Sequence, residues 1–274
     1  MARNKILSTA AMLLLIGLTG AACAQSDSTA AKHAGGERPG LMRPAGYLGD
    51  RVPAAKDYLL PPPAADSAEG QAELRIFHDT RALAGSARWK MAAQDAAFNM
   101  WPTFSCALDA KLAPDKVPLT SRLISRTMAD VGPIISRQKN FYNRPRPYTV
   151  AEGDTCVSTL TMSANTSYPS GHSTAGWTWT LLLAELVPDR AGQIIGRGRA
   201  FGESRVVCGV HYPSDVVAGQ TIATTVISAL QSDPDFIADR KAAQAELASA
   251  LAAAAKPDAA SCETESKLVR QRPW

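Results

Sequence analysis

Apolar residues recur at helical spacing along most of the chain beyond residue 66. Over residues 118–139 they return at every third or fourth position, which places them on one face of a helix. Residues 173–186 are apolar on nearly all sides, a pattern typical of a helix buried at the centre of a protein. Helices are also predicted over residues 191–207, 213–230 and 233–255. Because few runs alternate between apolar and polar residues, the pattern predicts an all-α fold, a compact helical bundle in a single domain.

The residues that precede these helices have a different composition. Residues 25–57 are rich in Ala, Gly, Pro and charge without a sustained period, so we expect a flexible arm. The segment Leu60-Pro61-Pro62-Pro63 cannot be helical. The first helix is predicted to begin at Asp66, because Glu69 three residues later completes a capping box. Two apolar faces follow: Leu74, Ile76, Phe77 and Leu83, then Trp89, Met91, Ala92, Ala96 and Phe98.

The N-terminus has the three parts of an export signal. Arg3 and Lys5 precede an apolar run over residues 10–18, and small residues follow up to Ala24, after which we expect cleavage. The alternative is a lipoprotein cleaved before Cys23, which is less favoured because Gly stands where such sites usually carry Leu. The expected organisation is a signal peptide at 1–24, the arm at 25–57, a helical domain at 58–256 and a C-terminal tail at 257–274. The mature protein would be periplasmic or secreted.

The composition is that of a globular protein and argues against nucleic acid as a partner. Hydrophobic residues make up 46% of the chain and charged residues 20%. The net charge of +4 falls to +2 once Arg3 and Lys5 are removed, which is too small for a nucleic-acid-binding surface. The mature chain has no run of some twenty apolar residues, so no stable membrane span is expected.

Four cysteines follow the signal: Cys106, Cys156, Cys208 and Cys262. An even number in an exported chain favours two disulfides, with three possible pairings. Four free, buried thiols are the alternative. None of the cysteine spacings is that of a metal knuckle, and the chain has only four histidines, so a zinc site is not expected.

Residues 202–215 bring a cation, an imidazole and a carboxylate together in one short segment. Pro213 is suited to the first position of a helix, which makes Tyr212 the cap and puts Asp215 in the first turn. From there the Asp215 carboxylate can reach back to His211 and hold one ring nitrogen, leaving the other free as a base, ligand or nucleophile. The alternative is that His211 only packs at a helix start.

Residues 140–172 form a long irregular connection, because prolines and glycines interrupt any helix there. Lys139, Arg144 and Arg146 stand at its beginning with two interleaved prolines. Such a charge run is commonly a solvated face, but arginines held by prolines also suit phosphate oxygens. At its end, Ser170-Gly171-His172 leads into the apolar helix, where backbone amides and the helix dipole favour an anion. An ordinary Ser cap with a chance His is the alternative.

The three segments together resemble the signature of the phosphatidic-acid-phosphatase type 2 superfamily. That signature is Lys139 followed after six residues by Arg146-Pro147, then Pro169-Ser170-Gly171-His172, then Ser204-Arg205, His211 and Asp215. The superfamily includes lipid phosphatases, vanadium haloperoxidases and bacterial acid phosphatases. The chain is most similar to the class A bacterial non-specific acid phosphatases, over roughly residues 57 to 245.

The resemblance implies a role for each matching residue. His211 would attack phosphorus and carry a transient phosphohistidine, with Asp215 on its other nitrogen. His172 would protonate the departing alkoxide. The phosphoryl oxygens would be bound by Lys139, Arg146, Ser170, Gly171 and Arg205. No metal or other cofactor is required in this scheme.

The resemblance therefore implies an exported, metal-independent acid phosphatase that acts on small phosphate monoesters. The alternative is a vanadate-dependent haloperoxidase that uses the same anion pocket. A homodimer or larger homo-oligomer is also implied. The role of Arg144 stays open. Among the three disulfide pairings, Cys106 with Cys262 and Cys156 with Cys208 is the one we favour.

Overall fold

The computed structural model describes residues 44–274. The predicted signal peptide, the lipoprotein alternative at Cys23 and most of the expected arm lie outside the described residues. Within them the chain forms ten α-helices and four short 3-10 turns, and no strand is present there, in agreement with the predicted all-α bundle. The helices are α1 (Ala68–Arg81), α2 (Ala87–Asp95), α3 (Met100–Leu108), α4 (Pro118–Tyr142), α5 (Pro147–Val150), α6 (Gly171–Leu186), α7 (Ala191–Val207), α8 (Pro213–Leu230), α9 (Pro234–Ala253) and α10 (Ala259–Val269).

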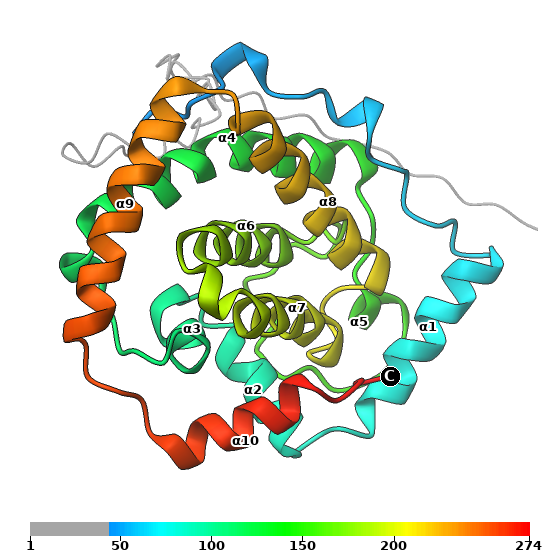
Figure 1. The fold of residues 1–274 in the computed structure, drawn as a ribbon. Coiled ribbons are helices and arrows are strands. Elements are labelled where there is room, and N and C mark those ends of the chain that lie inside the picture. Colours follow the sequence, from blue (N-terminus) through cyan, green and yellow to red (C-terminus); the bar gives the residue numbers. More distant parts are fainter. Residues whose placement is uncertain (1–43) are drawn as a thin grey trace, which may run out of the picture. The chain divides into compact units, whose positions relative to one another are not determined.

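Helices α6 and α7 lie at the centre of the bundle, and the other helices surround them (Figure 1). Helix α6 packs mainly against α7 and α8, and its further neighbours are α4 and α9. The prediction of a buried central helix over residues 173–186 is thus confirmed, because most of α6 is inaccessible to solvent. The largest side chains of this core include Phe201, Leu182, Leu183 and Ile222.

Two glycines allow α6 and α7 to approach each other closely. A Cβ atom at Gly176 of α6 would lie 2.2 Å from the ring of Phe201. A Cβ atom at Gly198 of α7 would lie 1.8 Å from Thr180 Oγ1. Only glycine fits at these two positions, so the sequence fixes how near the two central helices come.

The cap of the first helix lies one residue later than predicted. Ser67, and not Asp66, caps α1, and its hydroxyl accepts a hydrogen bond of 3.1 Å from the amide of Gly70. The preceding turn is tight, since a Cβ atom at Gly70 would lie 2.2 Å from the carbonyl oxygen of Ala64. The absence of a Cβ atom at Gly70 permits this tight turn at residues 64–67, and the cap at Ser67 starts the helix after it.

Ordered packing extends beyond both expected limits of the 58–256 domain. Tyr47 and Leu48 are buried, and their backbone amides donate hydrogen bonds of 2.8 and 3.1 Å to the carboxylate of Asp130 on α4. At the other end, α10 forms within the expected C-terminal tail, and a disulfide joins its Cys262 to Cys106 on α3. The second disulfide joins Cys156 to Cys208, so the pairing is the favoured one.

The sequence predicts no stable membrane span. Among residues 44–274, no helix combines the length and the apolar character that crossing a bilayer would require.

Candidate active site

The predicted site residues come from five elements that meet at one end of α6, and Arg146 directly precedes one of them, α5. Lys139 lies in the last turn of α4, Gly171 and His172 begin α6, and Arg205 lies near the end of α7. His211 directly precedes α8. The irregular connection between α4 and α6 is held by backbone hydrogen bonds, among them Ser170 N–H to the carbonyl of Asp215 at 2.9 Å and Arg146 N–H to Ala164 at 2.8 Å.

These elements enclose a cavity of about 530 Å³. Six of the predicted residues line it: Lys139, Arg146, Gly171, His172, Arg205 and His211. Ser170 and Asp215 lie behind this surface and are fully buried. The remaining wall is largely apolar and consists of Phe98, Met128, Ile135, Met162 and Ala175, with Thr161 and Ser163 as polar members.

His211 and Asp215 form a buried pair, as the spacing of the two residues predicts. Nδ1 of His211 lies 3.1 Å from Oδ2 of Asp215. Burial alone would raise the pKa of Asp215, but the hydrogen bonds from His211 and Ser167 and the positive charge of Arg144 lower it to about 2. An ionised Asp215 accepts the proton on Nδ1, which leaves the lone pair of the His211 ring on Nε2.

Nε2 of His211 faces the cations of the cavity. Nη1 of Arg146 lies 3.0 Å from this nitrogen, and the same guanidinium donates to the carbonyls of Val210 at 2.7 Å and Ser163 at 2.9 Å. Burial, with the nearby Arg146 and Lys139, lowers the pKa of His211 well below its ordinary value, although Asp215 opposes the shift. Burial and the two cations favour the neutral form of the imidazole over the protonated form.

Arg205 is the buried cation with the fewest partners in the site. It is 2% exposed, and neither its Nε nor its Nη1 has a hydrogen-bond partner among residues 44–274. Burying unpartnered guanidinium donors is costly. A tetrahedral anion in the cavity would supply acceptors of the kind that these donors lack.

Two further groups in the cavity are shifted towards their neutral forms. Burial, then repulsion by Arg146 and Arg205, lowers the pKa of Lys139 to about 7. Burial and the charge of Arg205 lower the pKa of His172 to about 3, although Nε2 of His172 lies 3.3 Å from the carbonyl of Ala96. Burial is the largest cause of both pKa shifts and the neighbouring positive charges add to it; a bound anion would oppose the second cause.

Ser170 and Gly171 occupy the N-terminal end of α6. The Ser170 hydroxyl caps the helix by accepting from the Ser173 amide at 3.2 Å, and it lies 2.9 Å from the Ser173 hydroxyl. Gly171 lines the cavity at the positive end of the helix dipole. The structure therefore places Gly171 on the surface of the cavity and Ser170 just beneath it.

Three residues around Asp215 were not assigned a role from the sequence. The Ser167 hydroxyl donates to Asp215 Oδ2 at 2.5 Å, and Arg144 donates to Oδ1 at 2.7 Å. Glu73 on α1 accepts from Arg144 at 2.7 Å. Arg144 was visible as an extra cation beside the first motif, but an isolated glutamate on a distant amphipathic helix gives no signal in the sequence.

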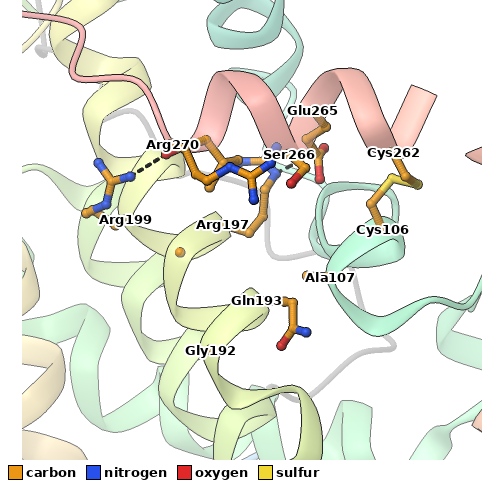
Figure 2. A pocket seen from close by; sticks show the side chains of 12 residues that line it. Cys106, Ala107, Gly192, Gln193, Arg197, Arg199, Cys262, Glu265, Ser266 and Arg270 are labelled. Carbon is orange, nitrogen blue, oxygen red and sulfur yellow. Dashed lines mark hydrogen bonds and ion pairs between the residues drawn. A yellow bond between two sulfur atoms is a disulfide. The ribbon is translucent and has the colours of Figure 1, made fainter. Parts of the chain in front are cut away.

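A second cavity, of about 520 Å³, lies between α7 and α10 beside the Cys106–Cys262 disulfide (Figure 2). Arg197 and Glu265 face each other there, with Nε and Oε2 3.2 Å apart. None of the predicted site residues lines this cavity.

Comparison with known proteins identifies the family. Residues 121–235 match the PAP2 superfamily, and these residues include every predicted site residue. An acid phosphatase of Zymomonas mobilis is 39% identical over 213 residues, which cover 76% of this chain and 81% of the relative. The chain belongs to the PAP2 superfamily.

Two further proteins resemble the chain at lower identity. A non-specific acid phosphatase of Salmonella typhimurium is 36% identical over 185 residues, covering 65% of this chain and 74% of the relative. A solved bacterial vanadium-dependent iodoperoxidase is 21% identical with a TM-score of 0.49, over 63% of this chain and 52% of that one.

Proposed function

We propose that this PAP2 protein is an exported, metal-independent acid phosphatase that hydrolyses small phosphate monoesters through a phosphohistidine intermediate. The activity class is supported by the relatives, which are named acid phosphatases and share 36 and 39% of their aligned residues with the chain. The finer mechanism is supported by one observation above the others. The His211 ring, paired with Asp215, presents Nε2 to a cavity lined by three buried or half-buried cations.

In the first step, His211 Nε2 attacks phosphorus. A bond forms between this nitrogen and phosphorus, and the bond between phosphorus and the ester oxygen breaks. The proton on Nδ1 stays hydrogen-bonded to Asp215, which stabilises the positive charge that develops on the ring. Lys139, Arg146 and Arg205 bind the phosphoryl oxygens together with the Gly171 amide, and their charge stabilises the transition state. The Ser170 hydroxyl lies beneath the cavity surface and caps the helix start that carries this amide.

His172 delivers a proton to the departing alkoxide. In the free protein the pKa of His172 is lowered to about 3 by burial and by Arg205, so this imidazole is neutral at mildly acid pH. A phosphate monoester has its second pKa near 6 and binds below that pH as a singly protonated anion. The anion offsets the repulsion from the cations, and its proton can then reside on His172. In the second step, the oxygen of a water molecule attacks phosphorus and the bond between phosphorus and His211 Nε2 breaks. Phosphate leaves, His211 is restored, and His172 accepts a proton from the water.

Metal independence is proposed because the cations already supply the charge that a metal would bring. Within residues 44–274, no three or more His, Cys, Asp or Glu side chains are grouped so that they could hold a metal ion. Export is supported by the two disulfides, which persist in oxidising compartments. Assembly as a homo-oligomer is a prediction from the family resemblance.

Hydrolysis of two matched esters after exhaustive chelation tests this proposal. Nitrophenyl phosphate and an alkyl phosphate should both be hydrolysed at mildly acid pH. In a single turnover, His172→Asn should release the alcohol of the alkyl ester about 10² to 10⁴-fold more slowly than the unmodified protein. The release of nitrophenolate from the aryl ester should slow far less, because nitrophenolate leaves without a proton. An equal loss on both esters would remove His172 from the role of acid. Loss of activity in chelator with recovery in zinc or magnesium would overturn metal independence.

The haloperoxidase alternative is less supported, because the curated relatives are named acid phosphatases. Incubation with vanadate, halide and peroxide tests it directly. We expect vanadate to inhibit ester hydrolysis, since its trigonal bipyramid resembles the phosphoryl transition state, and we expect no halide oxidation.

A further inference from the structure

Arg144 lies next to the proposed active site without lining its cavity. It follows α4 in the segment that also carries Arg146, and its side chain is only 10% exposed. Arg146 lines the cavity, whereas Arg144 is absent from the cavity wall and lies on the far side of Asp215. Its guanidinium is therefore not placed to bind the phosphoryl group.

The guanidinium of Arg144 links helices α1 and α8. Nη1 donates to Oδ1 of Asp215 at 2.7 Å and to the Ser214 hydroxyl at 2.8 Å. Nη2 donates to Oε2 of Glu73 at 2.7 Å. The carbon at the centre of the guanidinium lies 4.1 Å from the centroid of the Tyr212 ring. Both terminal nitrogens of the guanidinium are thus hydrogen-bonded to residues of α1 or of the start of α8.

Glu73 also binds the start of α8, through the backbone. Its Oε1 accepts a hydrogen bond of 2.6 Å from the backbone amide of Ser214, and its Oε2 accepts from Arg144. Glu73 is 4% exposed, so its negative charge is buried together with the charge of Arg144. A buried, hydrogen-bonded charge pair of this kind fixes the relative positions of the two side chains even where it adds little net stability.

The two carboxylate oxygens of Asp215 accept hydrogen bonds from different residues. Oδ2 accepts from Nδ1 of His211, from the Ser167 hydroxyl and from the Tyr212 amide at 2.9 Å. Among the described residues, the only side chain that donates to Oδ1 is Arg144. Without it, the carboxylate would have a buried, unpaired oxygen and would lose the one contact that fixes its orientation from the Oδ1 side.

We propose that Arg144 is a positioning residue for the nucleophile, held in place by Glu73. By binding Oδ1 of Asp215, Arg144 keeps Oδ2 directed at His211 Nδ1 and so keeps Nε2 directed at phosphorus. This role rests on the proposed phosphohistidine mechanism. It assigns to α1 a part in catalysis, although α1 contributes no residue to the cavity wall.

Arg144→Gln tests the proposal, with Arg137→Gln as the matched control. Arg137 is an exposed cation on α4, so its replacement removes the same charge without touching Asp215. Arg144→Gln should lower kcat for nitrophenyl phosphate roughly 10²-fold, the cost of a misplaced reacting group. The KM and the inhibition constant of inorganic phosphate should change by less than about threefold, because the phosphate-binding cations are intact.

Arg144→Lys is the second variant and preserves the charge, so the fold should survive the change. One ammonium cannot replace two planar arms that reach both Asp215 and Glu73, and we expect a loss of about tenfold in kcat at unchanged KM. A kcat within twofold of the unmodified protein for either variant would overturn the proposal. So would a rise in KM and in the phosphate inhibition constant at unchanged kcat, since that result would make Arg144 a phosphate ligand.

The unmodified protein and Arg137→Gln separate this proposal from the proposed function. If both hydrolyse the ester and only the Arg144 variants are slow in kcat, both proposals are supported. If the unmodified protein hydrolyses the ester and Arg144→Gln does so at the same rate, only the role of Arg144 is overturned. If the unmodified protein does not hydrolyse it, the proposed function itself fails.

Discussion

Lys139 shows most clearly how the cavity changes the properties of a single side chain. Burial and the neighbouring Arg146 and Arg205 lower its pKa to about 7, while Asp215 acts in the opposite direction. A lysine with this pKa is charged below pH 7 and loses its charge as the pH rises through that value. The free protein should therefore bind phosphate esters less well above neutrality.

Lys139→Arg should move the alkaline limb of the pH profile. A guanidinium keeps its charge across the range, so kcat/KM for nitrophenyl phosphate should stay high to a pH at least one unit above that of the unmodified protein. Profiles between pH 5 and 9 with the same substrate make the comparison, because the ionisation of the ester is then common to both. An alkaline limb at an unchanged pH would show that another group titrates there.

At the residue scale, the sequence predicted the lining of the cavity better than the groups behind it. The motif spacing identified Lys139, Arg146, His172, Arg205 and His211, all of which lie on the cavity wall. The contact of Arg144 with Glu73 joins residues 71 positions apart, and such contacts follow from the packing of helices and not from any local pattern. The pKa shifts could not be predicted for the same reason, since they depend on burial.

At the scale of elements, long helices with clear starts were predicted well and short ones were not. α7 and α8 have the predicted limits, and α4 and α6 differ from theirs by two or three residues. Each is long enough to show a helical period, and Pro118 and Pro213 mark the first positions of α4 and α8. α3 was missed because nine residues containing Pro102 give no sustained pattern. α10 was missed because its 11 residues bury none of their side chains fully.

The close contact between α6 and α7 can be tested with two glycine substitutions. Gly198→Ala puts a methyl group 1.8 Å from Thr180 Oγ1 and should lower the free energy of unfolding by about 1–3 kcal/mol or more. Gly132→Ala on α4 is the control, because its Cβ would meet no atom within 4 Å. That variant should gain about 0.5–1 kcal/mol from helix propensity. Equal effects in urea unfolding would contradict the assigned packing.

At the scale of the whole molecule, the last helix is attached to the bundle at a distance from the proposed active site. The Cys106–Cys262 disulfide closes a loop of 156 residues and lies beside the cavity between α7 and α10 (Figure 2). Glu265 on α10 contacts Arg197, which also pairs with Asp95 on α2. These contacts join α10 to α3 and α7, and no residue of α10 lines the cavity of the proposed active site.

Removing this cross-link should therefore affect stability more than catalysis. The double variant Cys106→Ser with Cys262→Ser should lose up to about 5 kcal/mol in the free energy of unfolding, the chain-entropy value for so long a loop. Its kcat at a temperature where it remains folded should stay within about twofold of the unmodified protein. Denaturant unfolding and ester hydrolysis measure the two effects, and a large loss of kcat in folded protein would link α10 to the site.

The central claim is that His211 carries the phosphoryl group, and trapping the intermediate tests it most directly. His172→Asn should still react with nitrophenyl phosphate, because this leaving group needs no acid, but it lacks the base that activates water. Phosphoenzyme should then accumulate. After rapid quenching, we predict close to one acid-labile phosphate per chain, located on His211 by peptide mapping and absent from a variant that also carries His211→Gln. Release of nitrophenolate without bound phosphate, or phosphate on any other residue, would contradict the account.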